Sequence, residues 1–322
     1  MHIRRILGGS AIVCAVIVVI VVAVLVYTGK QTAGPERDTA AGTGIPAGTG
    51  IAPAVAGTSG TASSAGISAA DRARINGAFG KIKAYASGRE GSVTAAVEDL
   101  RSGQTWTVGD GKPQDEASVV KADILQALLA RDPGGLPAGE RPVAQAMITD
   151  SDNDSATTLW NDAGGATGIG SWNSAAGLTG TRLSPCVECA GFAWPGWGLS
   201  TTTPSDQLAL LRQLAVPGTS RLSAPARSYA LSLMEHVTAD QRWGASSGVP
   251  SGVTVALKNG WLPLTPSSGA GAETDWQVNT IGWVSGQGRD YLIAVFSTGS
   301  PSEDYGIGTV SQIGTMTWNA MG

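Results

Sequence analysis

The spacing of apolar residues along the chain predicts an ordered series of helices and strands. Ser68 precedes a segment with apolar residues at Ile75 and Phe79, one helical turn apart, which predicts a capped amphipathic helix. β-branched and aromatic residues are then frequent in Ser92–Glu98 and Gln104–Val108, and this pattern predicts a strand pair. The part of the chain that begins at residue 68 therefore starts with a helix followed by two strands.

Helical patterns dominate from residue 118 to a loop of small residues at 246–252. Three strands are then predicted at Val253–Leu257, Trp276–Val284 and Asp290–Phe296. A last helix is predicted to start at Ser300-Pro301-Ser302-Glu303, read as a capping box with Pro301 in the first helical position. The simplest packing of this order is a five-stranded sheet flanked by the two terminal helices, with the helical block as an insertion.

The first 67 residues have a different character. Residues from Ala11 to Tyr27 are apolar and follow Arg4 and Arg5, and this run is close to the ~20 residues that span a bilayer. We expect residues 1–30 to form a cytoplasmic tip and membrane anchor, 31–67 a flexible Gly/Ala/Thr/Ser-rich linker, and 68–322 a single domain outside the cytoplasm. The alternative is a signal peptide whose cleavage releases a secreted protein.

Net charge limits the expected partners of the chain, and the cysteine pair predicts a disulfide. The 21 basic and 25 acidic residues give a net charge of −4, and the absence of a long basic run excludes nucleic acid as an expected partner. Cys186 and Cys189 form an even pair in an oxidising compartment, which predicts a local disulfide. A redox motif or a zinc site is the alternative, but His236 is the only histidine after residue 30, so a metal is not expected.

Ser118-Val119-Val120-Lys121 begins a segment that is apolar on nearly every side. A spacing of three places Ser118 and Lys121 on one helical face, where a neutral lysine could take the serine proton. The alternative is that Lys121 extends to the surface and Ser118 only caps the helix.

Two further motifs also have structural explanations. Ser151-Asp152-Asn153 precedes a predicted helix, and capping alone would account for its polar residues. Lys258-Asn259-Gly260 follows a predicted strand, and Asn-Gly between apolar runs is a strong hairpin signal.

In this order the three motifs resemble those of class A β-lactamases and penicillin-binding proteins, which are Ser-x-x-Lys, Ser-x-Asn and Lys-Thr/Ser-Gly. The flanking segments Met147–Asp150 and Thr201–Pro204 are also similar to class A sequence, and the resemblance extends over most of residues 68–322. It implies an α/β (α+β) fold with an antiparallel five-stranded sheet, terminal helices and an inserted all-helical subdomain. It also implies an amide hydrolase or acyltransferase that works through an acyl-serine without a metal or cofactor.

The resemblance implies three catalytic residues. Ser118 would be the nucleophile, Lys121 its activating base, and Ser151 the residue that passes a proton to the leaving nitrogen. The backbone N–H groups of Ser118 and Trp261 would form the oxyanion hole.

It also implies five substrate-binding residues. Asn153 would hold the substrate amide, Lys258 would supply positive potential, and Gly260 would let the substrate backbone approach. Asn259 occupies the position of a hydroxyl residue that contacts the substrate carboxylate. The full set is Asn153, Lys258, Asn259, Gly260 and Trp261.

Some family features are missing. Class A enzymes deacylate with a glutamate in a Glu-x-x-x-Asn pattern, whereas here Glu188 is the only carboxylate in residues 181–200 and Phe192 stands in the asparagine position. The strand predicted at 276–284 contains no arginine for a substrate carboxylate. These differences favour acylation over turnover.

Two hypotheses of function follow. The first is a membrane-tethered serine hydrolase acting on a β-lactam or a D-Ala-D-Ala-like peptidoglycan amide. The second is a catalytically degenerate cell-surface binding or scaffolding module with the same fold. In both we expect a monomer.

Overall fold

The computed structural model describes residues 67–190, 192–264 and 275–322. The predicted anchor and almost all of the predicted linker lie outside the described residues. Within those ranges, no helix is both long and apolar enough to cross a membrane.

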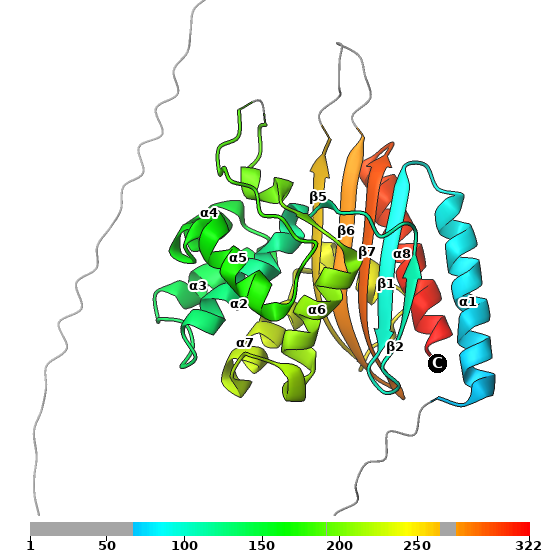
Figure 1. The fold of residues 1–322 in the computed structure, drawn as a ribbon. Coiled ribbons are helices and arrows are strands. Elements are labelled where there is room, and N and C mark those ends of the chain that lie inside the picture. Colours follow the sequence, from blue (N-terminus) through cyan, green and yellow to red (C-terminus); the bar gives the residue numbers. More distant parts are fainter. Residues whose placement is uncertain (1–66, 191, 265–274) are drawn as a thin grey trace, which may run out of the picture. The chain divides into compact units, whose positions relative to one another are not determined.

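A five-stranded antiparallel sheet forms the centre of the fold (Figure 1). Its order is β2-β1-β7-β6-β5, so strands from both ends of the domain lie side by side, as predicted. The antiparallel register pairs Val97 of β1 with Ile293 of β7 and Asn279 of β6 with Phe296 of β7. The strands are β1 Ser92–Asp99, β2 Gln104–Val108, β5 Thr254–Pro263, β6 Trp276–Gly286 and β7 Arg289–Ser300.

Successive strand residues point to opposite faces of the sheet, and a hydrophobic cluster buries the side chains on each face. On β7, Leu292 and Phe296 join one hydrophobic cluster with the helical block. Ile293 and Val295 join a second cluster with the terminal helices. This alternation places β7 at the centre of the domain with a hydrophobic core on each side.

The two terminal helices, α1 Ala69–Ser87 and α8 Glu303–Ala320, cover one face of the sheet (Figure 1). The Oγ of Ser68 accepts a hydrogen bond from Asp71 N at 3.0 Å, which confirms the predicted cap. The predicted start of the last helix was wrong, because Ser302 caps α8 instead of Ser300. Strand β7 continues through the buried Ser300, which pairs with Trp276 and is therefore not available to cap a helix.

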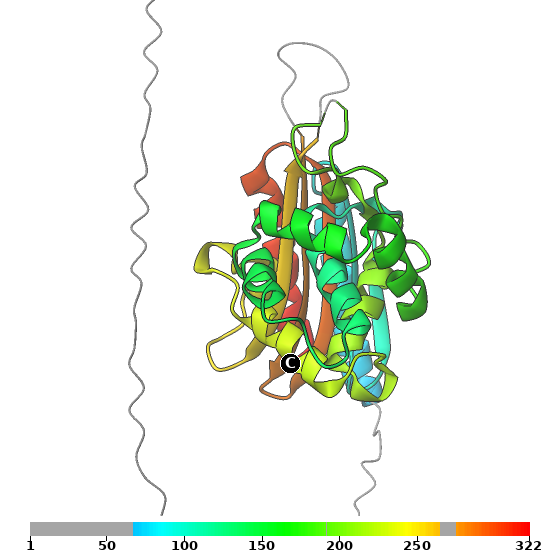
Figure 2. The ribbon, with the colours of Figure 1, turned by 90° about the vertical axis from the view of Figure 1, so that its left-hand side faces the viewer.

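The helical block covers the opposite face, where it is coloured green to yellow-green in Figure 2. A two-stranded sheet of β3 and β4 joins the segment before residue 118 to the segment before α6. The predicted helix at residue 118 begins as a short 3-10 helix, η1 Ala117–Val119, and continues as α2. The remaining elements are α2 Val120–Arg131, α3 Glu140–Gln145, η2 Ala146–Asp150, α4 Asn153–Asp162, α5 Gly165–Ala176, η3 Gly196–Leu199, α6 Pro204–Ala215, η4 Pro217–Thr219, α7 Ala224–Glu235, η5 Ala239–Gln241 and η6 Gly244–Ser246, with β3 Gln114–Asp115 and β4 Thr201–Thr202.

Strand β5 is longer than the sequence predicted, and the hairpin interpretation of Asn259-Gly260 was wrong. Asn259 pairs with Thr280 and Gly260 with Asn279, so both residues lie inside the strand. Gly260 is absent from the residues with positive φ, whereas a type I′ hairpin turn requires positive φ. Pairing with β6 therefore overrides the local turn preference.

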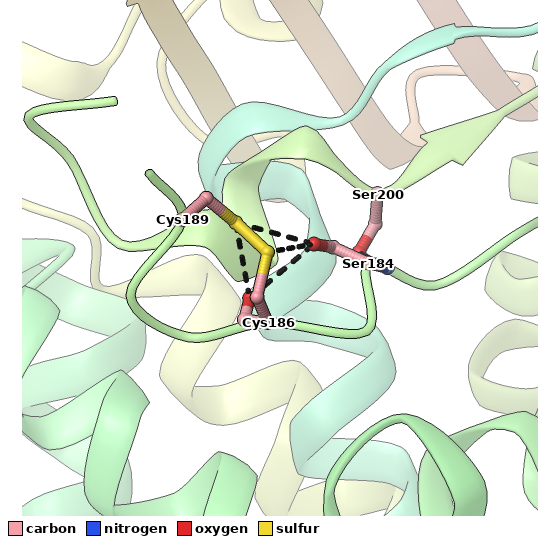
Figure 3. The surroundings of a disulfide bond; sticks show 4 residues. All are labelled: Ser184, Cys186, Cys189 and Ser200. Atoms are coloured by element: carbon pink, nitrogen blue, oxygen red, sulfur yellow. Dashed lines mark hydrogen bonds between the residues drawn. A yellow bond between two sulfur atoms is a disulfide. The ribbon is translucent and has the colours of Figure 1, made fainter. Parts of the chain in front are cut away.

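The predicted disulfide between Cys186 and Cys189 is present (Figure 3). Ser184 Oγ lies 3.6 Å from the Cys186 sulfur and 3.8 Å from the Cys189 sulfur. A Cβ atom on Gly196 would collide with the Cys189 sulfur, so only glycine fits at this position. The bridged turn thus packs directly against the start of η3.

Candidate active site

Side chains from all three sequence motifs meet where α2, α4 and the edge strand β5 converge. Lys121 Nζ lies 2.9 Å from Ser118 Oγ, 3.0 Å from Ser151 Oγ and 2.8 Å from Asn153 Oδ1. Lys258 Nζ donates to Ser151 Oγ at 3.0 Å from the other side. Ser151 therefore lies between the two lysines, and five of the predicted site residues form one cluster.

Local backbone geometry sets the positions of the two serines. Ala117 has a φ of 49° and Ser151 a φ of 57°, both in the left-handed region that non-glycine residues rarely adopt. Such strained residues are frequent at functional sites. Asp152 then caps α4 by accepting a hydrogen bond from Ser155 N at 2.7 Å, so the predicted capping holds and Asn153 is the first residue of α4.

Burial controls the charge of both lysines. Lys121 and Lys258 are fully buried, and neither forms an ion pair within the described residues. Desolvation, with a further contribution from the nearby Lys258, lowers the pKa of Lys121 to about 6. Desolvation alone lowers the pKa of Lys258 to about 7. At neutral pH Lys121 is therefore mostly neutral, and Lys258 supplies less positive potential than the sequence suggested.

The hydrogen bonds around Lys121 suit a neutral amine. Its two N–H groups can donate to oxygens that only accept, namely the backbone oxygen of Ser151 at 2.5 Å and Asn153 Oδ1 at 2.8 Å. Its lone pair then remains for the proton of Ser118 Oγ. The alternative of a surface-exposed Lys121 is ruled out, because Lys121 lies inside the cluster and 5.0 Å from the buried Trp197 ring.

Asn259 does not lie where a substrate-binding side chain was predicted. Its Nδ2 atom donates to the backbone oxygens of Gln241 and Trp243, at 2.7 and 3.3 Å. It is fully buried and lines neither of the cavities beside Ser118. Alternation along β5 explains this, because Lys258 faces the site and its neighbour therefore points away.

Gly260 has a structural role that the sequence did not predict. A Cβ atom there would lie 2.7 Å from Ser118 N and 2.8 Å from both Glu116 O and Val119 N. Gly260 therefore allows the turn that contains Ser118 to approach β5 closely, and its predicted contact with a substrate backbone stays a prediction.

Two cavities open beside Ser118. Most residues that line the smaller cavity are apolar or aromatic, among them Phe192 and Trp197 from the segment after the disulfide. The larger, about 390 Å³, contains Ser151 and three carboxylates. Trp261 lines both cavities, and the exposed Glu188 lines neither.

Residues 140–321, more than half of the chain, match the family model Beta-lactamase2, described as the β-lactamase enzyme family. The chain belongs to this family. The matched segment contains Ser151, Asn153 and Lys258. Ser118 and Lys121 precede it, and the hydrogen bonds of Lys121 to Ser118, Ser151 and Asn153 place both in the same cluster. The family and the fold identify a serine hydrolase.

Solved structures show the same fold. A β-lactamase from Chitinophaga pinensis DSM 2588 is 21% identical with a TM-score of 0.66, over 77% of this chain and 100% of that chain. A β-lactamase from Xanthomonas campestris pv. campestris is 19% identical with a TM-score of 0.63, over 77% and 99%. An ancestral class A β-lactamase is 20% identical with a TM-score of 0.60, over 76% and 99%.

Sequence reasoning missed a pair of buried carboxyl groups close in sequence to Ser118. Glu116 and Asp123 are fully buried, and desolvation raises both pKa values, that of Asp123 to about 7. Mutual repulsion raises the pKa of Glu116 further. The available signal in the sequence was the position of these two acidic residues, one just before and one inside the apolar segment that begins at Ala117. Asp240 and Glu303 were also missed, because they are distant in sequence from every motif.

Proposed function

We propose that this chain is an exported, membrane-tethered serine hydrolase or acyltransferase that forms an acyl-enzyme at Ser118. The observation that carries the proposal is the contact between Ser118 Oγ and the buried Lys121 amine, at 2.9 Å. Burial keeps that amine mostly neutral at pH 7, so it can act as a base.

In the proposed acylation, Lys121 Nζ takes the Ser118 proton while Ser118 Oγ bonds to the carbonyl carbon of an amide. The carbonyl oxygen becomes an oxyanion, for which the backbone N–H groups of Ser118 and Trp261 are the predicted donors. As the carbon–nitrogen bond breaks, Ser151 gives its proton to the leaving nitrogen. Ser151 regains a proton from Lys121, which lies 3.0 Å away, so the amine ends neutral.

The acyl-enzyme is expected to persist. Hydrolysis requires a base that activates water, and Glu188 is exposed and lines neither cavity. The proposed substrate is a β-lactam or a D-Ala-D-Ala-like amide, either of which presents the reactive carbonyl.

A fluorescent penicillin tests the acyl-serine. We expect stable labelling of the chain that disappears in Ser118→Ala, with Ser220→Ala as a control that keeps labelling, since Ser220 lies outside both cavities. Rapid turnover instead of stable labelling would make the chain an efficient β-lactamase. Complete failure to label would favour the binding-module hypothesis.

The proposed membrane tether rests on the apolar run from Ala11 to Tyr27 after Arg4 and Arg5. In cells, the chain should sediment with membranes and be digested by an external protease. Recovery of a shortened soluble chain from the medium would indicate signal-peptide cleavage instead.

A further inference from the structure

The larger cavity beside Ser118 is lined by acidic residues. Asp150, Asp240 and Glu303 line it, together with Ser118 and Ser151, and no lysine, arginine or histidine of the described chain does. None of the three carboxylates forms an ion pair within the described ranges. The cavity therefore has a negative potential.

Aromatic rings line the same cavity. Trp194, Trp261 and Trp276 contribute to its wall. Trp194 is 49% exposed and is the exposed large hydrophobic residue of the described chain. Indole faces attract cations, and quaternary ammonium groups are among the ligands that clusters of aromatic rings bind.

Gln241 adds an acceptor that has no partner. Its Nε2 atom donates to the backbone oxygen of Asp150 at 3.0 Å, which fixes the orientation of the amide. The side chain is only 5% exposed, and Oε1 accepts no hydrogen bond from any residue that the structure describes. Because Oε1 is itself inaccessible, it contributes a fixed dipole near the cavity and not a contact with an occupant.

The position of Ser151 assigns this cavity to one end of the substrate. Ser151 lines the acidic cavity and not the smaller apolar one, whereas Ser118 lines both. Because Ser151 is the proposed proton donor to the leaving group, that group would occupy the acidic cavity. The acyl part would then face the smaller one.

The two site lysines oppose a cation only weakly. Lys121 and Lys258 line neither cavity, and burial lowers their pKa values to about 6 and about 7. At neutral pH their combined charge is well below two, against three carboxylates on the cavity wall.

We propose that this enzyme prefers acyl compounds whose leaving group carries a positive charge. The carboxylates and tryptophans of the larger cavity would hold this cation while Ser118 attacks the carbonyl carbon. The proposal rests on the acyl-serine function described above and narrows its substrate class. A penicillin, whose carboxylate lies on the leaving-group side, should therefore label Ser118 more slowly than a cationic acyl compound acylates it.

Three acetyl thioesters test it with the full chain. Acetylthiocholine carries a quaternary ammonium, S-(3,3-dimethylbutyl) thioacetate is its uncharged isostere, and S-acetyl-3-mercaptopropionate carries a carboxylate. In each reaction Ser118 Oγ bonds to the acetyl carbon, the carbon–sulfur bond breaks, and the protonated thiol leaves. Because the acyl-enzyme is expected to persist, the rate is that of the single equivalent of thiol released on acylation. This rate should be roughly tenfold or more higher for the cation than for the isostere, and lowest for the anion.

Two substitutions locate the preference. Asp240→Asn and Glu303→Gln should each lower the ratio of cationic to uncharged rate about threefold, because each removes one charge from the cavity. Asp304→Asn is the matched control, since Asp304 is the exposed neighbour of Glu303 on α8 and does not line the cavity. In this control, the ratio of cationic to uncharged rate should stay within roughly a factor of 1.5 of the ratio in the parent chain.

The outcomes separate this proposal from the proposed function. Penicillin labelling of Ser118 with equal rates for all three thioesters would overturn the cation preference and leave the acyl-serine intact. If nothing acylates Ser118, the proposed function fails. The cation site can then be tested separately by measuring choline binding to Ser118→Ala through the change in tryptophan fluorescence. Binding that weakens in the Asp240→Asn background supports a cation site, and no binding overturns it.

Discussion

At the residue scale, the ionisation of Lys121 sets the expected pH dependence of acylation. The amine must be neutral to accept the Ser118 proton, and its pKa is lowered to about 6. The acylation rate should therefore rise as pH increases through 6. Lys121→Arg should abolish this rise of the rate with pH and slow labelling ~10²–10⁴-fold, because a guanidinium does not deprotonate. Stopped-flow labelling between pH 4.5 and 8 measures both, and an unchanged profile in Lys121→Arg would assign the base elsewhere.

Gly260 gives a second prediction at this scale. Gly260→Ala should destabilise the domain by about 1–3 kcal/mol, because the new Cβ would overlap the backbone around Ser118. It should also slow acylation, since the nucleophile turn must shift. Urea unfolding and penicillin labelling measure the two effects. Gly252→Ala is a poor control because Gly252 has a φ of 82°. Gly80→Ala on α1 has free space, so it should leave labelling unchanged and raise stability by up to ~1 kcal/mol, as expected for an exposed position inside a helix.

At the scale of elements, the Cys186–Cys189 turn supports one wall of the site. It packs against Gly196, and the segment that follows it supplies Trp194 and Trp197 to the cavity wall. Reduction of the disulfide should slow acylation by roughly threefold to tenfold while the fold persists, because a ring this short constrains the unfolded chain little. Labelling rates with and without a reductant test this. The Cys186→Ser/Cys189→Ser variant should be acylated slowly with and without the reductant. If its acylation rate equals that of the oxidised chain, the disulfide has no role in the site.

At the scale of the whole molecule, the Glu116–Asp123 pair makes folding stability depend on pH. Both pKa values are raised by burial, that of Asp123 to about 7, whereas an unfolded aspartate titrates near ~3.9. Between these values the unfolded chain releases a proton that the folded chain keeps. The free energy of unfolding should therefore fall as pH rises from about 4 to 7, by up to ~1.4 kcal/mol per pH unit for one group.

Asp123→Asn should flatten this dependence, because an amide resembles the protonated carboxyl and does not titrate. Urea unfolding at pH 5.0 and 7.5 compares the variant with the parent chain. Asp162→Asn, on the surface of α4, is a control that should keep the parent slope. An equal slope in parent and Asp123→Asn would show that Asp123 is already ionised in the folded state.

The sequence by itself determined the features that depend on near neighbours. The caps at Ser68 and Asp152, the disulfide between cysteines three positions apart, and the shared helical face of Ser118 and Lys121 all follow from local geometry. The order of elements determined the sheet, because apolar periodicity marks which segments must be buried.

Tertiary structure decided what depends on distant contacts. Pairing with β6 carried β5 through Asn259-Gly260 and turned Asn259 away from the site, against a local preference for a turn. The fold also placed Asp240 and Glu303, far from every motif, in one cavity with Ser118. Local patterns record a residue's preference for helix, strand or turn, but the charge around a catalytic serine is summed over space, so only the folded chain defines it.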